Sequence, residues 1–129
     1  RNRCDNHVSF LGAIPNWDIY EYYAIADICV SLSIYGTLVN STIEAMGYGK
    51  AIIVASSGDI DEKLTNGFDA IILEENSVED LSANLIELLL NDNKRKSMQN
   101  NALSTFNSNF ITWEERLDKE IYHIHKLLK

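Results

Sequence analysis

The sequence predicts an α/β domain in which a mostly parallel sheet is covered by helices on both faces. Four short runs rich in β-branched residues are nearly continuous in apolar character, which is typical of strands buried on both faces. Segments with a helical period of apolar residues lie between these runs, so strands and helices alternate. The chain of 129 residues is 46% apolar, which is enough for one compact core.

The four expected strands are short and bounded by turn residues. They span His7–Leu11, Ile28–Ser33, Ala51–Ala55 and Ala70–Leu73. Branched side chains pack well on a pleated surface, so these runs favour strands over helices of the same length.

Two helices near the end of the chain are marked by capping boxes, formed by Ser77 with Asp80 and by Thr112 with Glu115. The apolar positions that follow share the helical period; they are Leu81, Leu85 and Leu88 in the first helix, and Trp113, Leu117, Ile121, Ile124 and Leu128 in the second.

Two further helices are expected. One lies between the capped helices and has Met98, Ala102 and Phe106 on one face. The other follows Pro15, with Asn16 as its N-cap. Its inner side is expected to carry Tyr20, Tyr23 and Ala24.

Charge and cysteine content exclude several classes of protein. Nineteen acidic against 11 basic residues give a net charge of -8, which argues against nucleic acid or an anionic membrane surface as a partner. Cys4 and Cys29 have neither disulfide-framework nor zinc spacing, and no apolar stretch is long enough to span a membrane. We therefore expect a cytoplasmic protein. The abrupt start at Arg1 suggests a piece of a longer chain.

The loop after Ile28–Ser33 is the expected ligand site. In a parallel sheet, ligands bind beyond the carboxyl ends of strands, where helix N-termini offer free N–H groups to phosphate. Small residues at Gly36, Thr37 and Ser41 allow a ligand to approach the backbone closely.

The same loop carries a family resemblance. Asn40–Met46 reads NSTIEAM and is followed by GKAII at Gly49–Ile53, which resembles the N-S-x-x-E-A-M-x-x-G-K-P-V-I run of retaining, family 4 type (group 1) GT-B glycosyltransferases. Four other segments resemble the family's runs in the same order, namely Val8–Gly12 (V-x-F-L-G), Tyr23–Asp27 (Y-x-x-A-D), Asn66–Leu73 (D-G-x-N-G-x-L-V), and Asn101–Ala102 with Trp113–Glu114 (the closing helices).

The resemblance implies that residues 1–129 form one Rossmann-like domain, the C-terminal, nucleotide-sugar-binding domain of a two-domain GT-B chain. It implies that the Glu44 carboxylate binds the ribose hydroxyls, which suits an acceptor with two oxygens. Backbone amides around Val39, Asn40 and Ser41 would hold the diphosphate, and Gly12 would line the base pocket. The donor would be a UDP-, GDP- or ADP-sugar, with no further cofactor and no metal.

Two departures from the family pattern affect the expected activity. Gly36 stands eight residues before Glu44, where the family has the acid that meets the transferred hexose. The family's opening strand and glycine-rich turn, its basic pair and its acceptor domain do not precede His7, so we expect the isolated fragment to lack turnover.

Other motifs have plainer interpretations. Ser41 and Glu44 also have the spacing of a capping box, so Glu44 could serve the helix start, and the two roles are compatible. Asp59 and Asp61 form a D-x-D pair, but they open a short helix, where acids are favoured by the helix dipole. The histidines at positions 7, 123 and 125 have no partner spacing.

The leading hypothesis is therefore half of a retaining glycosyltransferase that moves a sugar to a saccharide or lipid-linked acceptor. The acceptor would bind through the missing N-terminal domain. We expect no direct membrane insertion; at most, the rest of the chain would contact the inner face of the membrane. The alternative is an inactive nucleotide-sugar-binding or pairing module. A receiver-like signalling domain has the same alternation, but its strand-end acids are missing here.

Overall fold

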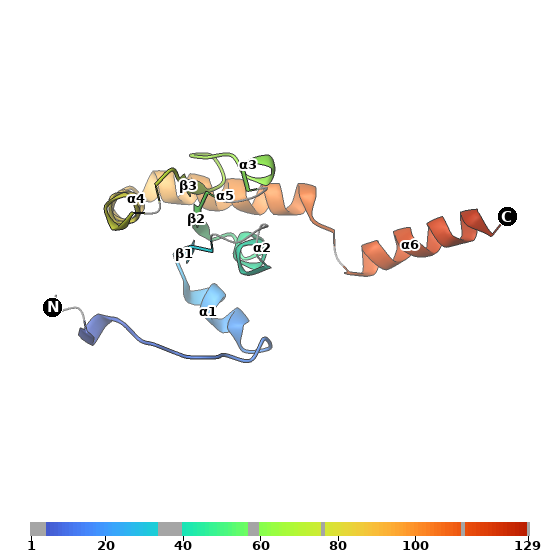
Figure 1. The fold of residues 1–129 in the computed structure, drawn as a ribbon, viewed down its shortest axis with the longest axis horizontal. Helices are drawn as coiled ribbons and strands as arrows, with labels where there is room; N and C mark the ends of the chain where they lie inside the picture. Colours follow the sequence, from blue (N-terminus) through green and yellow to red (C-terminus); the bar gives the residue numbers. More distant parts are fainter. Residues whose placement is uncertain (1–4, 34–39, 57–59, 76, 112, 129) are drawn as a thin grey trace.

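The computed structural model describes residues 5–33, 40–56, 60–75, 77–111 and 113–128. Its elements along the chain are η1 (Asp5–His7), α1 (Ile19–Ile25), β1 (Ile28–Ser31), α2 (Asn40–Gly47), β2 (Ala51–Ala55), α3 (Ile60–Lys63), β3 (Ile71–Leu73), α4 (Val78–Leu90), α5 (Asp92–Asn109) and α6 (Trp113–Leu127) (Figure 1).

The three strands form a parallel sheet in the order β1-β2-β3. Ile28 pairs with Ala51, and Ile53 pairs with Ile71, so the strands start at the same edge of the sheet. All five residues of β2 and all three of β3 are buried, because β2 is the central strand and both faces are covered. The predicted fold class is thus confirmed.

Side chains alternate between two apolar clusters on the two faces of the sheet. One face contributes Ile52, Val54 and Ile72 to a cluster completed by residues of α2, α3 and α5. The other face contributes Ala51, Ile53, Ile71 and Leu73 to a cluster with Leu88 of α4 and Met98 of α5. This is the strict alternation that a strand imposes on its side chains.

Helix α2 ends in a Schellman motif that turns the chain directly into β2. The Gly49 N–H donates to the Met46 carbonyl at 2.9 Å and the Lys50 N–H to the Ala45 carbonyl at 3.0 Å. Gly49 has a φ of 61°, a left-handed conformation that glycine adopts without strain.

Helix α5 crosses the edge of the sheet at which the strands begin. The Gln99 amide donates to the carbonyl of Asp27, just before β1, and the Asn101 amide donates to Phe68, shortly before β3. Leu103 lies beside Gly49, just before β2. The opposite edge, where the strands end and α2 begins, is the edge at which the sequence predicts a ligand site.

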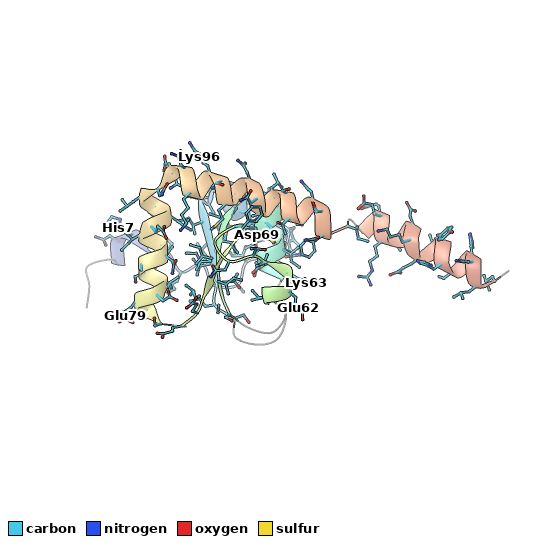
Figure 2. The ribbon with its side chains drawn as sticks, turned by 90° about the horizontal axis from the view of Figure 1, so that it is seen from above. His7, Glu62, Lys63, Asp69, Glu79 and Lys96 are labelled. Atoms are coloured by element: carbon cyan, nitrogen blue, oxygen red, sulfur yellow. The ribbon has the colours of Figure 1, made fainter. Side chains whose placement is uncertain are left out.

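A buried acid holds the turn before β3 beneath α5. The Asp69 carboxylate accepts from the Thr65 N–H at 2.7 Å and from the Thr105 hydroxyl at 2.8 Å. Figure 2 shows Asp69 inside the body of the molecule, whereas Lys96, Glu62 and Lys63 lie at its outer edge. Both carboxylate oxygens have donors, which offsets the cost of burial.

The caps and termini follow the sequence predictions only in part. Ser77 caps α4 as predicted, accepting from the Asp80 N–H at 3.1 Å. Thr112 lies outside the described residues. Helix α6 extends away from the rest in both figures, and its predicted apolar face is exposed, as at Leu117 and Ile121. The predicted helix is formed, but none of the other described residues covers the apolar face of α6.

The strand predicted over His7–Leu11 is not formed. Residues 8–11 have no regular structure, and Phe10 is 96% exposed. A strand requires a neighbour for its backbone groups, and the described part of the sheet is made by β1, β2 and β3 alone. The β-branched and aromatic residues of this run favour a strand, but none of the described strands pairs with them.

Two details of the first helix were also wrong. Asp18, not Asn16, is the N-cap, because the chain turns once more after Pro15, with the Asp18 N–H donating to the Pro15 carbonyl at 2.9 Å. Tyr20 and Ala24 are exposed, and Tyr23 is the half-buried member of the predicted inner face. The strand predicted to Ser33 ends at Ser31.

Candidate functional site

Glu44 lies one turn into α2, on the side of the sheet where β1 ends. Its neighbours Thr42, Ala45 and Met46 are buried against the core, and Glu44 itself is half-buried. Because α2 already includes Asn40 and Ser41, Ser41 is not the N-cap and Glu44 is not at the third helical position. The capping-box interpretation of Glu44 is therefore wrong, and its carboxylate is directed to another partner.

That partner is Tyr23 of α1. The Tyr23 hydroxyl donates to Oε2 of Glu44 at 3.0 Å. The Tyr23 ring stacks on the ring of Tyr48, with 5.6 Å between centroids and 24° between planes. Burial and, after it, the hydrogen bond to the Glu44 carboxylate raise the pKa of Tyr23 to about 12. The phenol therefore stays protonated and acts as a donor throughout the physiological range.

Two hollows flank this hydrogen bond. The first, of about 200 Å³, is lined by Asn16, Ile19, Tyr20, Tyr23, Glu44 and Tyr48. The second, of about 230 Å³, is lined by Tyr23, Cys29, Val30, Ser31, Ser41, Thr42 and Ile52. Tyr23 lines both hollows, so its side chain separates the hollow beside Glu44 from the hollow beside Ser41 and Thr42.

The second hollow holds an orphan polar group. Thr42 is 2% exposed, and its hydroxyl has no hydrogen-bond partner among the described residues. Cys29 is a free thiol that packs against the core. Burial raises the pKa of Cys29, with Lys50 acting in the opposite sense, so the thiol behaves as the small apolar group expected from the sequence.

Another cavity lies away from Glu44, beside β3 and the start of α4. Its volume is about 410 Å³, and four of its lining residues are acidic: Glu74, Glu75, Glu79 and Asp80. The Asp80 carboxylate is already engaged, since it accepts from the Asn84 amide at 2.8 Å and from the Glu75 N–H at 3.4 Å. This cavity therefore reflects the capping of α4 and holds none of the predicted site residues.

The structure places four of the seven predicted site residues. Glu44, Ser41 and Asn40 lie together on the first turns of α2, with Ser41 lining the second hollow. Gly12 has a φ of 67° and lines neither hollow. The other three, Gly36, Thr37 and Val39, lie outside the described residues.

Sequence reasoning missed Tyr23 and Thr42 as site residues. The signal for Tyr23 was present, because it opens the Tyr23–Asp27 run that resembles the family, but it was assigned to the core face of a helix. Nothing in the pattern marked the buried hydroxyl of Thr42.

The described residues contain no group of three or more acidic, histidine or cysteine side chains that could hold a metal ion. The D-x-D pair lies outside the described residues at Asp59 and at the side chain of Asp61. Within the described residues, no helix is long and apolar enough to cross a membrane.

Known proteins resemble this chain in sequence and fold. Residues 3–105 match the family described as glycosyl transferases group 1. An uncharacterized glycosyltransferase of Methanocaldococcus jannaschii is 30% identical over 115 residues, which are 88% of this chain and 29% of that protein. The chain thus spans under a third of the length of this curated relative.

Two solved structures have the same fold. Sucrose-phosphate synthase from Thermosynechococcus elongatus superposes with a TM-score of 0.81 at 20% identity, over 97% of this chain and 32% of that chain. The Anabaena HepE protein in complex with UDP-glucose gives a TM-score of 0.72 at 26% identity, over 82% of this chain and 29% of that chain. With four-fifths of its residues matched to the family, this chain belongs to the group 1 glycosyl transferases and has the fold of GT-B glycosyltransferases.

Proposed function

We propose that these residues form the nucleotide-diphospho-sugar-binding lobe of a retaining glycosyltransferase that transfers a sugar to a saccharide or lipid-linked acceptor. The observation that carries the proposal is the Glu44 carboxylate, half-buried on α2 at the carboxyl edge of a parallel sheet and bordering a hollow of about 200 Å³. Ligands of open α/β sheets bind at this edge.

The chemistry of the edge suits a ribose diphosphate. A carboxylate accepts hydrogen bonds from two neighbouring hydroxyls, and the free N–H groups at the start of α2 favour phosphate oxygens. Asn40 and Ser41 lie at that start and are exposed to solvent. The HepE protein, 26% identical to this chain, binds UDP-glucose, which supports a nucleotide-sugar as the donor.

The contribution of this lobe to catalysis would be positioning and charge stabilisation. The departing nucleoside diphosphate carries the charge that develops in the transition state, and helix amides can stabilise it without reorganisation. No base or nucleophile is assigned to these residues.

A second candidate is a nucleotide-sugar-binding or pairing module without transfer activity. It is favoured by Gly36, which stands where the family has the acid that meets the hexose. Both candidates bind the donor, but only the enzyme releases nucleoside diphosphate when donor and acceptor are supplied together. Release by the complete protein, with UDP-, GDP- and ADP-sugars screened in turn, separates the two.

Glu44→Ala tests the binding site. In the complete protein, the variant should weaken binding of UDP, GDP or ADP, whichever binds best, about 10- to 100-fold, because charge-assisted hydrogen bonds to the ribose are lost. Isothermal titration calorimetry measures the change.

Glu114→Ala is the matched control, since Glu114 is an exposed acid on α6, away from the sheet. It should leave the affinity unchanged. An equal affinity of the Glu44→Ala variant and the unaltered protein would remove Glu44 from the site and with it the proposed ribose contact.

A further inference from the structure

The Glu44 carboxylate receives its described hydrogen bond from a residue 21 positions earlier in the chain. Tyr23 and Glu44 are brought together by the packing of α1 beside α2, and the hydroxyl reaches Oε2 at 3.0 Å. A glutamate side chain on a helix surface samples several rotamers, and one directed hydrogen bond to a fixed partner restricts them.

We propose that Tyr23 is a positioning residue, whose hydroxyl holds the Glu44 carboxylate in the orientation that accepts the ribose hydroxyls of the donor. This inference rests on the proposed function and deepens it. It assigns to Tyr23 a role that acts through Glu44, without contact to the reacting atoms.

Tyr23 is itself held well enough to orient another side chain. Its ring stacks on Tyr48 and packs against the core cluster that includes Ala45 and Met46. The end of α1 is tied down by Lys50, whose ammonium donates to the Ala24 carbonyl at 3.1 Å. These contacts hold the Tyr23 ring against α2 and Tyr48, so its hydroxyl is directed at Glu44.

The hydrogen bond leaves the carboxylate free to bind a ligand. An ionised carboxylate has about four acceptor positions, and Tyr23 occupies one of them on Oε2. No other described residue donates to this carboxylate, so Oε1 and the second position of Oε2 remain for two neighbouring hydroxyls.

The position of Tyr23 also argues against a purely structural role. Helix α1 has no buried residue; Ile19 and Tyr23 are half-buried, and of these two Tyr23 packs against the core cluster. The apolar contact is made by the Tyr23 ring and does not need the hydroxyl. The hydroxyl is thus the part of Tyr23 that serves Glu44, and it can be removed by itself.

Tyr23→Phe in the complete protein is the test. The dissociation constant for the nucleoside diphosphate that binds best among UDP, GDP and ADP should rise about 3- to 10-fold, as expected for losing one hydrogen bond to a charged group. For the analogue of the same nucleotide with dideoxyribose in place of ribose, the variant and the unaltered protein should bind equally.

Tyr22→Phe is the matched control, with the same atom removed from the same helix at an exposed tyrosine. It should change neither constant. A double variant, Tyr23→Phe with Glu44→Ala, should bind no more weakly than Glu44→Ala alone, because Tyr23 acts through Glu44.

Three outcomes would overturn the inference. Equal affinity of Tyr23→Phe and the unaltered protein, while Glu44→Ala weakens binding, removes Tyr23 alone and leaves the proposed function intact. An equal loss for the ribose and dideoxyribose nucleotides shows a merely structural role. If the unaltered complete protein binds none of the nucleotides, the proposed function fails first, and this inference fails with it.

Discussion

Strand β2 and helix α1 are held in the molecule in opposite ways. All five residues of β2 are buried between two apolar clusters, whereas α1 has no buried residue. Helix α1 is attached through the half-buried ring of Tyr23 and through hydrogen bonds such as that from Lys50 to the Ala24 carbonyl. Burial is the larger source of stability, so the two regions should open at different free energies.

The candidate site straddles these two regions. Glu44 is on α2, whose inner side at Thr42, Ala45 and Met46 is buried, and the donor to its carboxylate is on α1. One half of the site is therefore packed on the core, and the other half depends on the attachment of α1. A ligand that needs Glu44 oriented stabilises α1 as well, because binding favours the state in which both are in place.

The largest expected effect sharpens the contrast between core and periphery. Leu88→Ala, at a fully buried position of α4, should lower the free energy of unfolding by about 2–5 kcal/mol through lost apolar burial and the cavity left behind. Leu117→Ala, at a half-exposed position of α6, should change it by less than about 0.5 kcal/mol. Urea unfolding of both variants measures the difference. Equal losses would show that α6 is packed in solution.

A smaller effect tests the attachment of α1. Tyr48→Ala removes the ring on which Tyr23 stacks, a contact worth about 0.5–1.5 kcal/mol beyond apolar burial. Amides of α1 should exchange with solvent faster in the variant, while those of β2 keep their protection, because α1 opens separately from the core. Hydrogen exchange followed by mass spectrometry reads both segments. Protection lost equally in α1 and β2 would mean that they open together.

The sequence predicted the parts of the fold that depend on local pattern. Buried runs such as Ala51–Ala55 form strands as expected, and Ser77 caps α4. The strand predicted over His7–Leu11 is not formed, because a strand also needs a neighbouring strand to pair with, and the local sequence pattern does not show whether one is present. For the same reason, the amphipathic pattern of α6 predicts which side of the helix is apolar, but it does not predict what packs against that side.

The candidate site was predicted in part. The family-like run placed Glu44 on a helix at the carboxyl edge of the sheet, and the structure agrees. The rival capping box had the right spacing, but α2 already includes Asn40 and Ser41, so Ser41 is not its N-cap. Boundaries are the least predictable feature of a helix. The bond from Tyr23 was not predictable, because it joins residues 21 positions apart through tertiary packing.

The smallest expected effect examines the Tyr23–Glu44 bond through its pH dependence. The pKa of Tyr23 is raised from 10.0 to about 12, by burial first and by Glu44 second. Between these values an unfolded tyrosine has lost its proton and the folded one has kept it, so the unfolded state binds fewer protons. The contribution of this group to stability is full below pH ~10 and is lost as the pH rises to about 12.

Tyr23→Phe isolates this contribution, because every other group is shared with the unaltered protein. The free energy of unfolding of the unaltered protein should fall more steeply from pH ~10 to ~12 than that of the variant. Urea unfolding at several pH values measures the two slopes. Equal slopes would mean that the Tyr23 hydroxyl ionises as freely as an exposed phenol, and α1 would then be attached by the ring of Tyr23 without its hydrogen bond to Glu44.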